Sequence, residues 1–264
     1  MAGKSLLPPP PGAGIIASFI KSGRTWLRFM LAQYLADRHG LGPVDLHSLF
    51  AIVPNNDDDP VRGRAVYAHA DRPDVPRVLC EHQFWSPFDP AVNPTVVMVR
   101  QPVDTIVSAY FMETRQTGRL DVPLGDYLRT KRGIARWISY HNLLVAQRGG
   151  PDVTWVSYEQ LTHDPEATFA RVLDRFGIRR EPAAMARAIA AAQFDRMAAL
   201  ENEQGFPGNS ADPADPQGRR MREGRIGASA ALLSDDDRDF VARKLNETLD
   251  IAARERLASL GCNL

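Results

Sequence analysis

The chain has 264 residues, of which 44% are apolar, enough for the core of one large α/β domain. Its 32 basic and 32 acidic residues cancel, so the overall charge gives no reason to expect nucleic acid or an anionic membrane as a partner. Two cysteines, Cys80 and Cys262, are too few for a disulfide framework or a metal cluster, and no apolar run has the length of a membrane span. We therefore expect a cytoplasmic protein with a disordered leader at 1–13 and a single domain at 14–264.

The predicted elements alternate between strands and helices. Apolar runs predict strands at 15–20, 65–69, 77–82, 95–100 and 153–158. Helical spacing of apolar residues predicts helices at 25–38, 103–117, 122–147, 165–176, 181–199 and 235–259. This alternation is typical of a central, mainly parallel β-sheet flanked by helices, which binds its ligands at the carboxyl ends of the strands. Residues 204–227 are rich in Gly, Pro, Asp and Arg and have no periodicity, which predicts a long loop.

The first strand leads into a basic turn that opens the first helix. Its sequence is Lys21-Ser22-Gly23-Arg24-Thr25-Trp26. Backbone N–H groups and the helix dipole at such a turn attract an anion, and Lys21 and Arg24 add formal charge. A nucleotide triphosphatase loop has its lysine after the last glycine and then a hydroxyl for magnesium, whereas Lys21 precedes the only glycine of this turn. The turn therefore predicts a phosphate site of another kind.

Two later strand ends also carry groups that could bind a nucleotide. Arg100 ends the strand at 95–100 and Ser108 follows on the next helix, so the two could clasp one phosphate, although a surface arginine with an exposed serine fits the pattern equally well. An arginine at this strand end argues against a metal-dependent triphosphatase, which would present an aspartate there. Tyr158 ends the strand at 153–158 and could hydrogen-bond a ligand base or close the core.

Five motifs in this order resemble the sulfotransferases that use 3′-phosphoadenosine 5′-phosphosulfate (PAPS). They are K-S-G-x-T-W at 21–26, V-R-x-P-x-D-x-x-x-S-x-Y at 99–110, Y-E-x-L-x-x-D-P-E at 158–166, Q-F-D-R-M at 193–197 for the family's T-S-F-x-x-M, and R-E-G-R-I-G at 222–227 for its R-K-G-x-x-G. The resemblance covers about residues 15 to 227. It implies an O-sulfotransferase with a P-loop-kinase-like, three-layer α/β fold. PAPS would be the co-substrate, its desulfated form PAP the product, a small-molecule alcohol the acceptor, and no metal would take part.

The resemblance also implies a role for each matched residue. Lys21 would neutralise charge on the leaving phosphate, and Ser108 would restrain Lys21 until the acceptor arrives. The residues implied to contact the nucleotide are Lys21, Ser22, Gly23, Arg24, Thr25, Trp26, Arg100, Ser108, Tyr158, Phe194, Arg222, Glu223 and Gly224. Within this set, 22–26 would bind the 5′-phosphate. The 3′-phosphate would be bound by Arg100, Ser108, Arg222 and Gly224, and the adenine by Trp26, Tyr158 and Phe194.

The family's catalytic base is a histidine in a K-T-H segment at a strand end, and His82 occupies the matching place. An imidazole of near-neutral pKa suits a base that takes a proton from an alcohol. His69 at the end of another apolar run and the adjacent Glu81 are rivals. Cys80 and Glu81 replace the lysine and threonine of the family pattern, so the contact of a second lysine with the sulfonyl group is lost.

Further departures leave other functions open. Glu223 replaces a lysine near the 3′-phosphate, for which Arg219, Arg220 or Arg225 could compensate, and Gln193 removes a hydroxyl contact. An ATP-dependent small-molecule kinase and a non-catalytic nucleotide-binding relative are the alternatives. The acceptor pocket is expected at 40–64, 83–93 and 111–135.

Overall fold

The computed structural model describes residues 9–56, 67, 69–82, 89–212 and 214–264. Within them, β1 (Gly14–Ser18), β2 (Val78–Glu81), β3 (Thr95–Val99) and β4 (Val153–Ser157) form a sheet in the order β2-β1-β3-β4. All three pairings are parallel, with Ile16 opposite both Cys80 and Val96, and Met98 opposite Val156. These four strands confirm the predicted parallel sheet. The strand predicted at 65–69 lies largely outside the described residues.

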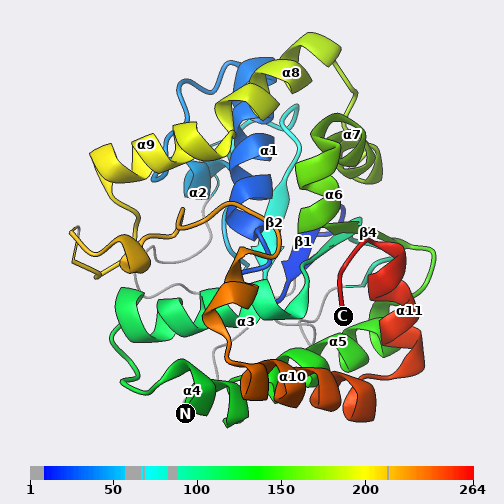
Figure 1. Cartoon of the computed structure of the whole chain (residues 1–264). Coiled ribbons are helices and arrows are strands. Elements are labelled where there is room, and N and C mark those ends of the chain that lie inside the picture. The colour runs from blue at the N-terminus through cyan, green and yellow to red at the C-terminus, as the bar shows by residue number, and fades with distance from the viewer. Residues whose placement is uncertain (1–8, 57–66, 68, 83–88, 213) are drawn as a thin grey trace.

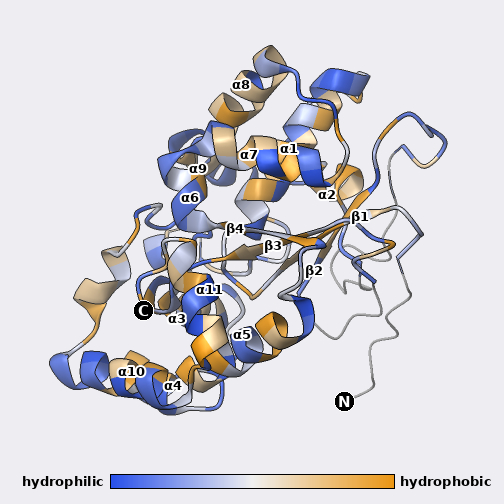
Figure 2. Ribbon diagram, turned by 90° about the vertical axis from the view of Figure 1, so that its right-hand side faces the viewer, coloured by the Kyte–Doolittle hydropathy of each residue, from blue (hydrophilic) through white to orange (hydrophobic). Residues whose placement is uncertain are grey.

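Helices cover both faces of the sheet, as the α/β prediction required (Figure 1). One face carries α1 (Arg24–His39), α2 (Leu49–Ile52), α6 (Tyr158–His163), α7 (Pro165–Arg175), α8 (Pro182–Ala191) and α9 (Phe194–Gln204). The other carries α3 (Pro102–Phe111), α4 (Leu124–Arg129), α5 (Ile134–Arg148), α10 (Asp235–Thr248) and α11 (Ile251–Ser259). Figure 2 shows these two groups of helices on opposite sides of the strands, and apolar residues of each group form a core cluster with the sheet.

The sheet divides the core into two clusters because side chains alternate along each strand. Ile16 and Met98 pack with α1, α7 and α8, whereas Ile15, Ala17 and Val97 pack with α3, α5 and α11. Every residue of β1, β2 and β3 is buried, which is why these strands read as continuous apolar runs. The rigid sheet fixes the ends of its strands, from which the functional loops emerge.

Three helices predicted as continuous are divided in the structure. The turn between α4 and α5 is closed by Thr130, whose Oγ1 donates to the Tyr127 carbonyl over 2.8 Å. The α8–α9 break lies at Ala192, whose carbonyl accepts from Trp26 Nε1 over 2.7 Å. Asn142 on α5 holds the α10–α11 break, because its side chain donates to Thr248 O and accepts from Asp250 N. Each break depends on side-chain hydrogen bonds, two of them from distant segments, that helical periodicity does not record.

Several shorter features were also missed. The helix predicted at 103–117 becomes a π-helix over Met112–Gln116, and 3-10 turns occur at Pro216–Gly218 and Ala228–Leu232. A capping box between Ser157 and Gln160 begins α6, so Tyr158 is the first residue of a helix and not the end of a strand. Of the expected leader at 1–13, residues 9–13 are described, and Gly12 N donates to Val92 O. No helix in the described ranges is both long and apolar enough to cross a membrane.

Candidate functional site

The loop that joins β1 to α1 is shaped as a cradle. Lys21 and Gly23 both have positive φ, 62° and 94°, and α1 begins at Arg24. A Cβ on Gly23 would lie 2.7 Å from the Tyr158 ring and 2.8 Å from Met98, so only glycine fits there. The hydroxyl of Ser22 is fully buried without a hydrogen-bond partner in the described structure. A helix N-terminus with an unused buried hydroxyl fits a phosphate group.

Lys21 lies in a strongly positive environment. Its pKa is lowered from 10.5 to about 7, chiefly by burial and then by Arg220, with smaller contributions from Arg100 and Arg222, while the Glu201 carboxylate raises it. These arginines come from β3 and from the late loop, so segments far apart in the sequence meet around one lysine. Cations placed this close repel one another unless an anion lies between them. The arrangement therefore favours an anionic ligand.

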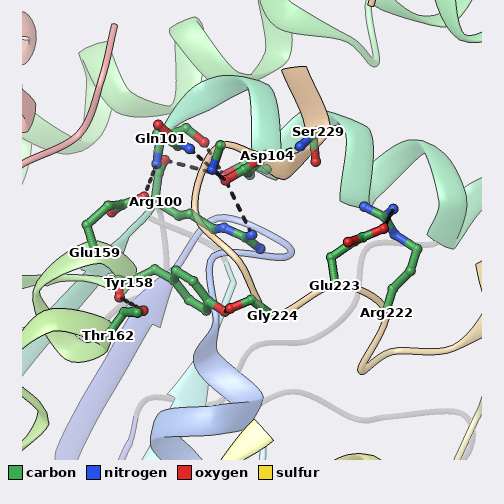
Figure 3. A network of polar contacts seen from close by, with 12 residues as sticks. Arg100, Gln101, Asp104, Tyr158, Glu159, Thr162, Arg222, Glu223, Gly224 and Ser229 are labelled. Atoms are coloured by element: carbon green, nitrogen blue, oxygen red, sulfur yellow. Dashed lines mark hydrogen bonds and ion pairs between the residues drawn. The ribbon is translucent and has the colours of Figure 1, made fainter. Parts of the chain in front are cut away.

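Arg100 lies just beyond the carboxyl end of β3, where its side chain is only 12% exposed. Its guanidinium lies 4.1 Å from the centre of the Tyr158 ring and 3.6 Å from Asp104 Oδ2. The Tyr158 hydroxyl donates to the Gly224 carbonyl over 3.1 Å, which joins α6 to the late loop (Figure 3). Ser108 is half-buried further along α3. Arg100 and Tyr158 are thus brought to one place, next to the loop at Gly224.

Aromatic rings gather beside this cluster. The rings of Trp26 and Tyr158 lie 5.2 Å apart. Phe194 begins α9 and is 37% exposed, and a Cβ on Gly224 would lie 2.4 Å from its ring. Gly224 has φ 65°, so both conformation and space require glycine there. Two aromatic side chains with accessible surface beside an anion site can hold a flat heterocycle.

The late loop brings Arg222 and Glu223 to the same region. The Arg222 side chain is 9% exposed and its guanidinium lies 4.5 Å from the centre of the Phe111 ring. Glu223 lies between two arginines, 3.6 Å from Arg222 and 3.3 Å from Arg225. Arg225 is 79% exposed, whereas Arg220 influences Lys21 directly. Of the arginines expected to compensate for Glu223, Arg220 is therefore placed to add charge at the anion site.

His82 and Glu81 follow one another at the carboxyl end of β2. The His82 ring lies 3.0 Å from Ser18 O through Nδ1, and Arg24 contacts its Nε2. Since a carbonyl only accepts, Nδ1 carries the proton and Nε2 accepts from Arg24. The Glu81 carboxylate is 1% exposed and accepts from His82 N over 2.8 Å and from Asn56 Nδ2 over 3.2 Å. His82 thus offers the more accessible basic atom.

The pKa of His82 lies well below its usual value. Desolvation by surrounding protein atoms is the main cause, even though part of the ring reaches solvent, and the Arg24 guanidinium adds to it. The imidazole is therefore neutral at pH 7. The rival His69 lies apart from these residues, buried against the Tyr67 ring at 5.2 Å.

Cys80 stands where the K-T-H segment of the sulfotransferases has its lysine, and it contacts an arginine of α1. Cys80 is buried, and its sulfur accepts from Arg28 Nε over 3.1 Å. Arg28 is itself almost fully buried and also contacts Asn55. A buried arginine therefore packs behind the base, on α1, where neither motif nor spacing indicated one.

Two carboxylates of the site received no role from the sequence. Asp104 occurs inside the V-R-x-P-x-D motif, yet its position in the first turn of α3 indicates only helix capping. Glu201 falls in no motif and is one of several acidic residues near the end of α9. Both are buried and both bind backbone of the late loop.

Comparison with known proteins agrees with the motifs. Residues 94–182 match the model described as Sulfotransferase family. Retinol dehydratase in complex with androsterone and inactive cofactor PAP shares 15% identity, with 92% of this chain and 82% of that chain covered and a TM-score of 0.69. Retinol dehydratase in a complex with retinol and PAP shares 16% identity, with 92% of this chain and 83% of that chain covered and a TM-score of 0.67. Mouse sulfotransferase SULT7A1 complexed with PAP shares 15% identity, with 95% of this chain and 90% of that chain covered and a TM-score of 0.63. No curated protein matches the chain.

The solved structures test the predicted fold, and the family model tests the predicted resemblance in sequence. At such low identity the solved structures establish the fold, which is shared over nearly the whole chain, while the family model reaches β3, α3 and β4 with the segments around them. The resemblance to sulfotransferases is confirmed, by sequence over residues 94–182 and by fold over the chain as a whole.

Proposed function

We propose that this protein transfers the sulfonyl group of PAPS to the hydroxyl of a small molecule. The observation that carries the proposal is the convergence of Lys21, Arg100 and Arg222 beside the aromatic rings of Trp26 and Phe194 at the carboxyl ends of β1 and β3. Two separated anionic groups and a flat base are the features of PAPS that such a site would recognise. The similar structures of retinol dehydratase and mouse sulfotransferase SULT7A1, each in complex with PAP, support the same ligand.

Each residue of the site has a proposed task. The N–H groups at the start of α1 and the hydroxyls of Ser22 and Thr25 hold the 5′-phosphate, and Arg100, Ser108 and Arg222 hold the 3′-phosphate. Lys21 stabilises negative charge on the phosphate oxygen that leaves when the S–O bond breaks. The nucleotide supplies the sulfonyl group and a good leaving group. No member of this set is a carboxylate that could hold magnesium, and the residue that follows β3 is an arginine.

The proton of the acceptor alcohol is proposed to pass to His82 Nε2 as the new O–S bond forms. Because Arg24 contacts this atom, Arg24 must turn away before Nε2 can accept a proton. The 5′-phosphate would be held by the same loop as Arg24 and would draw its guanidinium away from His82. Glu81 stays an alternative base, although both of its oxygens are already engaged.

We propose an apolar alcohol as the acceptor. Retinol and androsterone occur in two of the similar structures, and both are apolar alcohols. In this chain, the partly buried rings of Tyr110 and Phe111 follow Ser108 on α3 and supply an apolar wall beside the site. The near-zero net charge gives no support for a strongly anionic acceptor. A cytoplasmic location, where thiols such as Cys80 stay reduced, completes the proposal.

The test measures PAP binding by calorimetry and transfer of labelled sulfate from PAPS to a panel of alcohols and phenols. We expect micromolar or tighter PAP binding, transfer without added metal, and loss of transfer in Lys21→Ala. Lys244→Ala, on the exposed surface of α10, is the matched control and should behave as the wild type. Absence of both PAP binding and transfer would refute the proposal. Magnesium-dependent ATP turnover would establish a kinase instead, and tight PAP binding without transfer to any acceptor would favour a non-catalytic relative.

A further inference from the structure

The late loop that carries Arg222 and Gly224 is fastened at both ends by buried carboxylates. We call residues 219–229 the strap. At its start, Glu201 on α9 accepts from Arg220 N and Met221 N, each over 2.8 Å. At its end, Asp104 on α3 accepts from Gly227 N over 2.8 Å and from Ser229 N over 3.1 Å. Figure 3 shows Asp104 directed toward Ser229, with Gly224 between Tyr158 and the rest of the strap.

The two carboxylates that fasten the strap are buried, which is unusual for charged groups. Glu201 is 7% exposed and Asp104 is 1% exposed, so both negative charges are removed from water. A buried carboxylate is tolerated only when hydrogen bonds or cations compensate it. In both residues the two oxygens each bind a different N–H of the strap, and Asp104 also receives Gln101 Nε2 over 2.6 Å. The strap therefore supplies part of this compensation at both carboxylates, together with Arg100 and Gln101 at Asp104.

Asp104 could be read as a helix cap, because it lies in the first turn of α3. Its oxygens, however, bind backbone that is 123 and 125 residues distant in sequence. Burial alone would raise the pKa of Asp104, but Arg100, Gln101 and the strap N–H groups outweigh burial and hold the pKa below its usual range. Asp104 thereby links the strap to Arg100, which lies 3.6 Å away.

Glu201 makes the equivalent link at the other end. Its carboxylate holds the backbone of Arg220, and it is the charge that opposes the surrounding arginines at Lys21. Between the two carboxylates, the Tyr158 hydroxyl donates to Gly224 O, and the Arg222 guanidinium lies 4.5 Å from the centre of the Phe111 ring. The two carboxylates accept four backbone N–H bonds of the strap. Gln116 Nε2 adds a hydrogen bond to Arg219 O over 3.1 Å, and Met221 and Ile226 add apolar contacts with the core.

We propose that Glu201 and Asp104 are positioning residues that clamp the strap over the nucleotide, and that neither touches the nucleotide itself. The clamp presents Arg222 and Gly224 to the ligand and couples them to Lys21 on one side and to Arg100 on the other. This inference rests on the proposed function for the identity of the nucleotide, but the fastening of the strap does not.

The test compares Glu201→Gln and Asp104→Asn in the full chain with the wild type, using PAP as the ligand. Glu203→Gln on the exposed side of α9 and Asp126→Asn on α4 are matched controls. Hydrogen exchange of the strap amides is measured with and without PAP, and PAP affinity is measured by calorimetry. We expect faster exchange over 219–229 in both ligand-free variants, and PAP binding weaker by about tenfold to hundredfold, as befits the loss of hydrogen bonds to a charged group.

The outcomes separate the clamp from the proposed function. Wild-type exchange in Glu201→Gln would refute the clamp, and so would weaker PAP binding without faster exchange, since the carboxylate would then act on the ligand directly. If the wild type bound no PAP, the proposed function would fail while the exchange comparison would still decide on the clamp. Should Asp104→Asn not fold, Glu201→Gln gives the same comparison. Tyr158→Phe then serves for the ligand-free exchange alone, with a smaller increase expected because it loses one uncharged bond to the strap.

Discussion

Affinity for PAP is expected to fall steeply above neutral pH because of Lys21. Burial, followed by the Arg220 guanidinium, lowers the pKa of Lys21 from 10.5 to about 7 in the free protein. A bound phosphate favours the charged ammonium and returns this pKa toward its ordinary value. Binding therefore takes up a proton. Affinity is greatest below pH 7 and decreases as pH rises through 7, because fewer free molecules carry the charge that the phosphate needs.

The size of the effect follows from the fraction of protonated Lys21. With a pKa of about 7, that fraction is about one half at pH 7 and about 1% at pH 9. PAP affinity should thus fall by about fiftyfold between these values, which corresponds to roughly 2.3 kcal/mol. The second ionisation of phosphate monoesters is centred near pH 6, so the charge of the ligand changes little between pH 7 and 9.

Calorimetry of PAP binding at constant ionic strength measures this dependence. Repeating each titration in two buffers of different ionisation enthalpy reports the proton uptake itself. Lys21→Met should bind PAP more weakly and with no pH dependence of this kind, whereas Lys244→Met should keep the wild-type slope. An affinity that changed by less than about threefold from pH 7 to 9 would refute the reasoning, as would a slope that survived in Lys21→Met.

Three further predictions concern the base, the strap and stability. His82→Ala should lower kcat by about a hundredfold or more with PAP binding retained, and activity lost only in Glu81→Ala would assign the base to Glu81. Gly224→Ala should weaken PAP binding by about tenfold or more, because its φ is 65° and a Cβ would lie 2.4 Å from the ring that begins α9. Gly205→Ala, with φ 70° and open space, is the control, and equal effects on PAP binding would rule out the clash. Since the folded-state pKa of Lys21 is depressed, burial of its charge destabilises the protein below pH 7 and ceases to do so as pH rises toward 10.5. Lys21→Met should therefore raise the melting temperature of ligand-free protein more at pH 6 than at pH 10, and equal increments at both would contradict this cause.

From the sequence alone, the parallel sheet and four of its strands could be predicted, and so could the order along the chain of the motifs proposed to bind phosphate. Strands buried on both faces must be apolar throughout, so β1, β3 and β4 could be found from their composition. The turn at 21–26 could be found because glycine is required where Tyr158 and Met98 approach the backbone. Both requirements act within a short segment, so both can be recognised from the local amino-acid sequence.

Contacts between side chains of distant segments became visible only in the folded structure. The sequence did not indicate that Arg24 contacts His82, or that Arg28 packs on Cys80 in place of a second lysine. Nor did it separate Glu201 from its exposed neighbour Glu203, since both are acidic residues on one helix. The loop at 204–227 reads as unstructured because its order comes from carboxylates on α3 and α9, and a bond between a side chain and distant backbone has no sequence period by which it could be recognised.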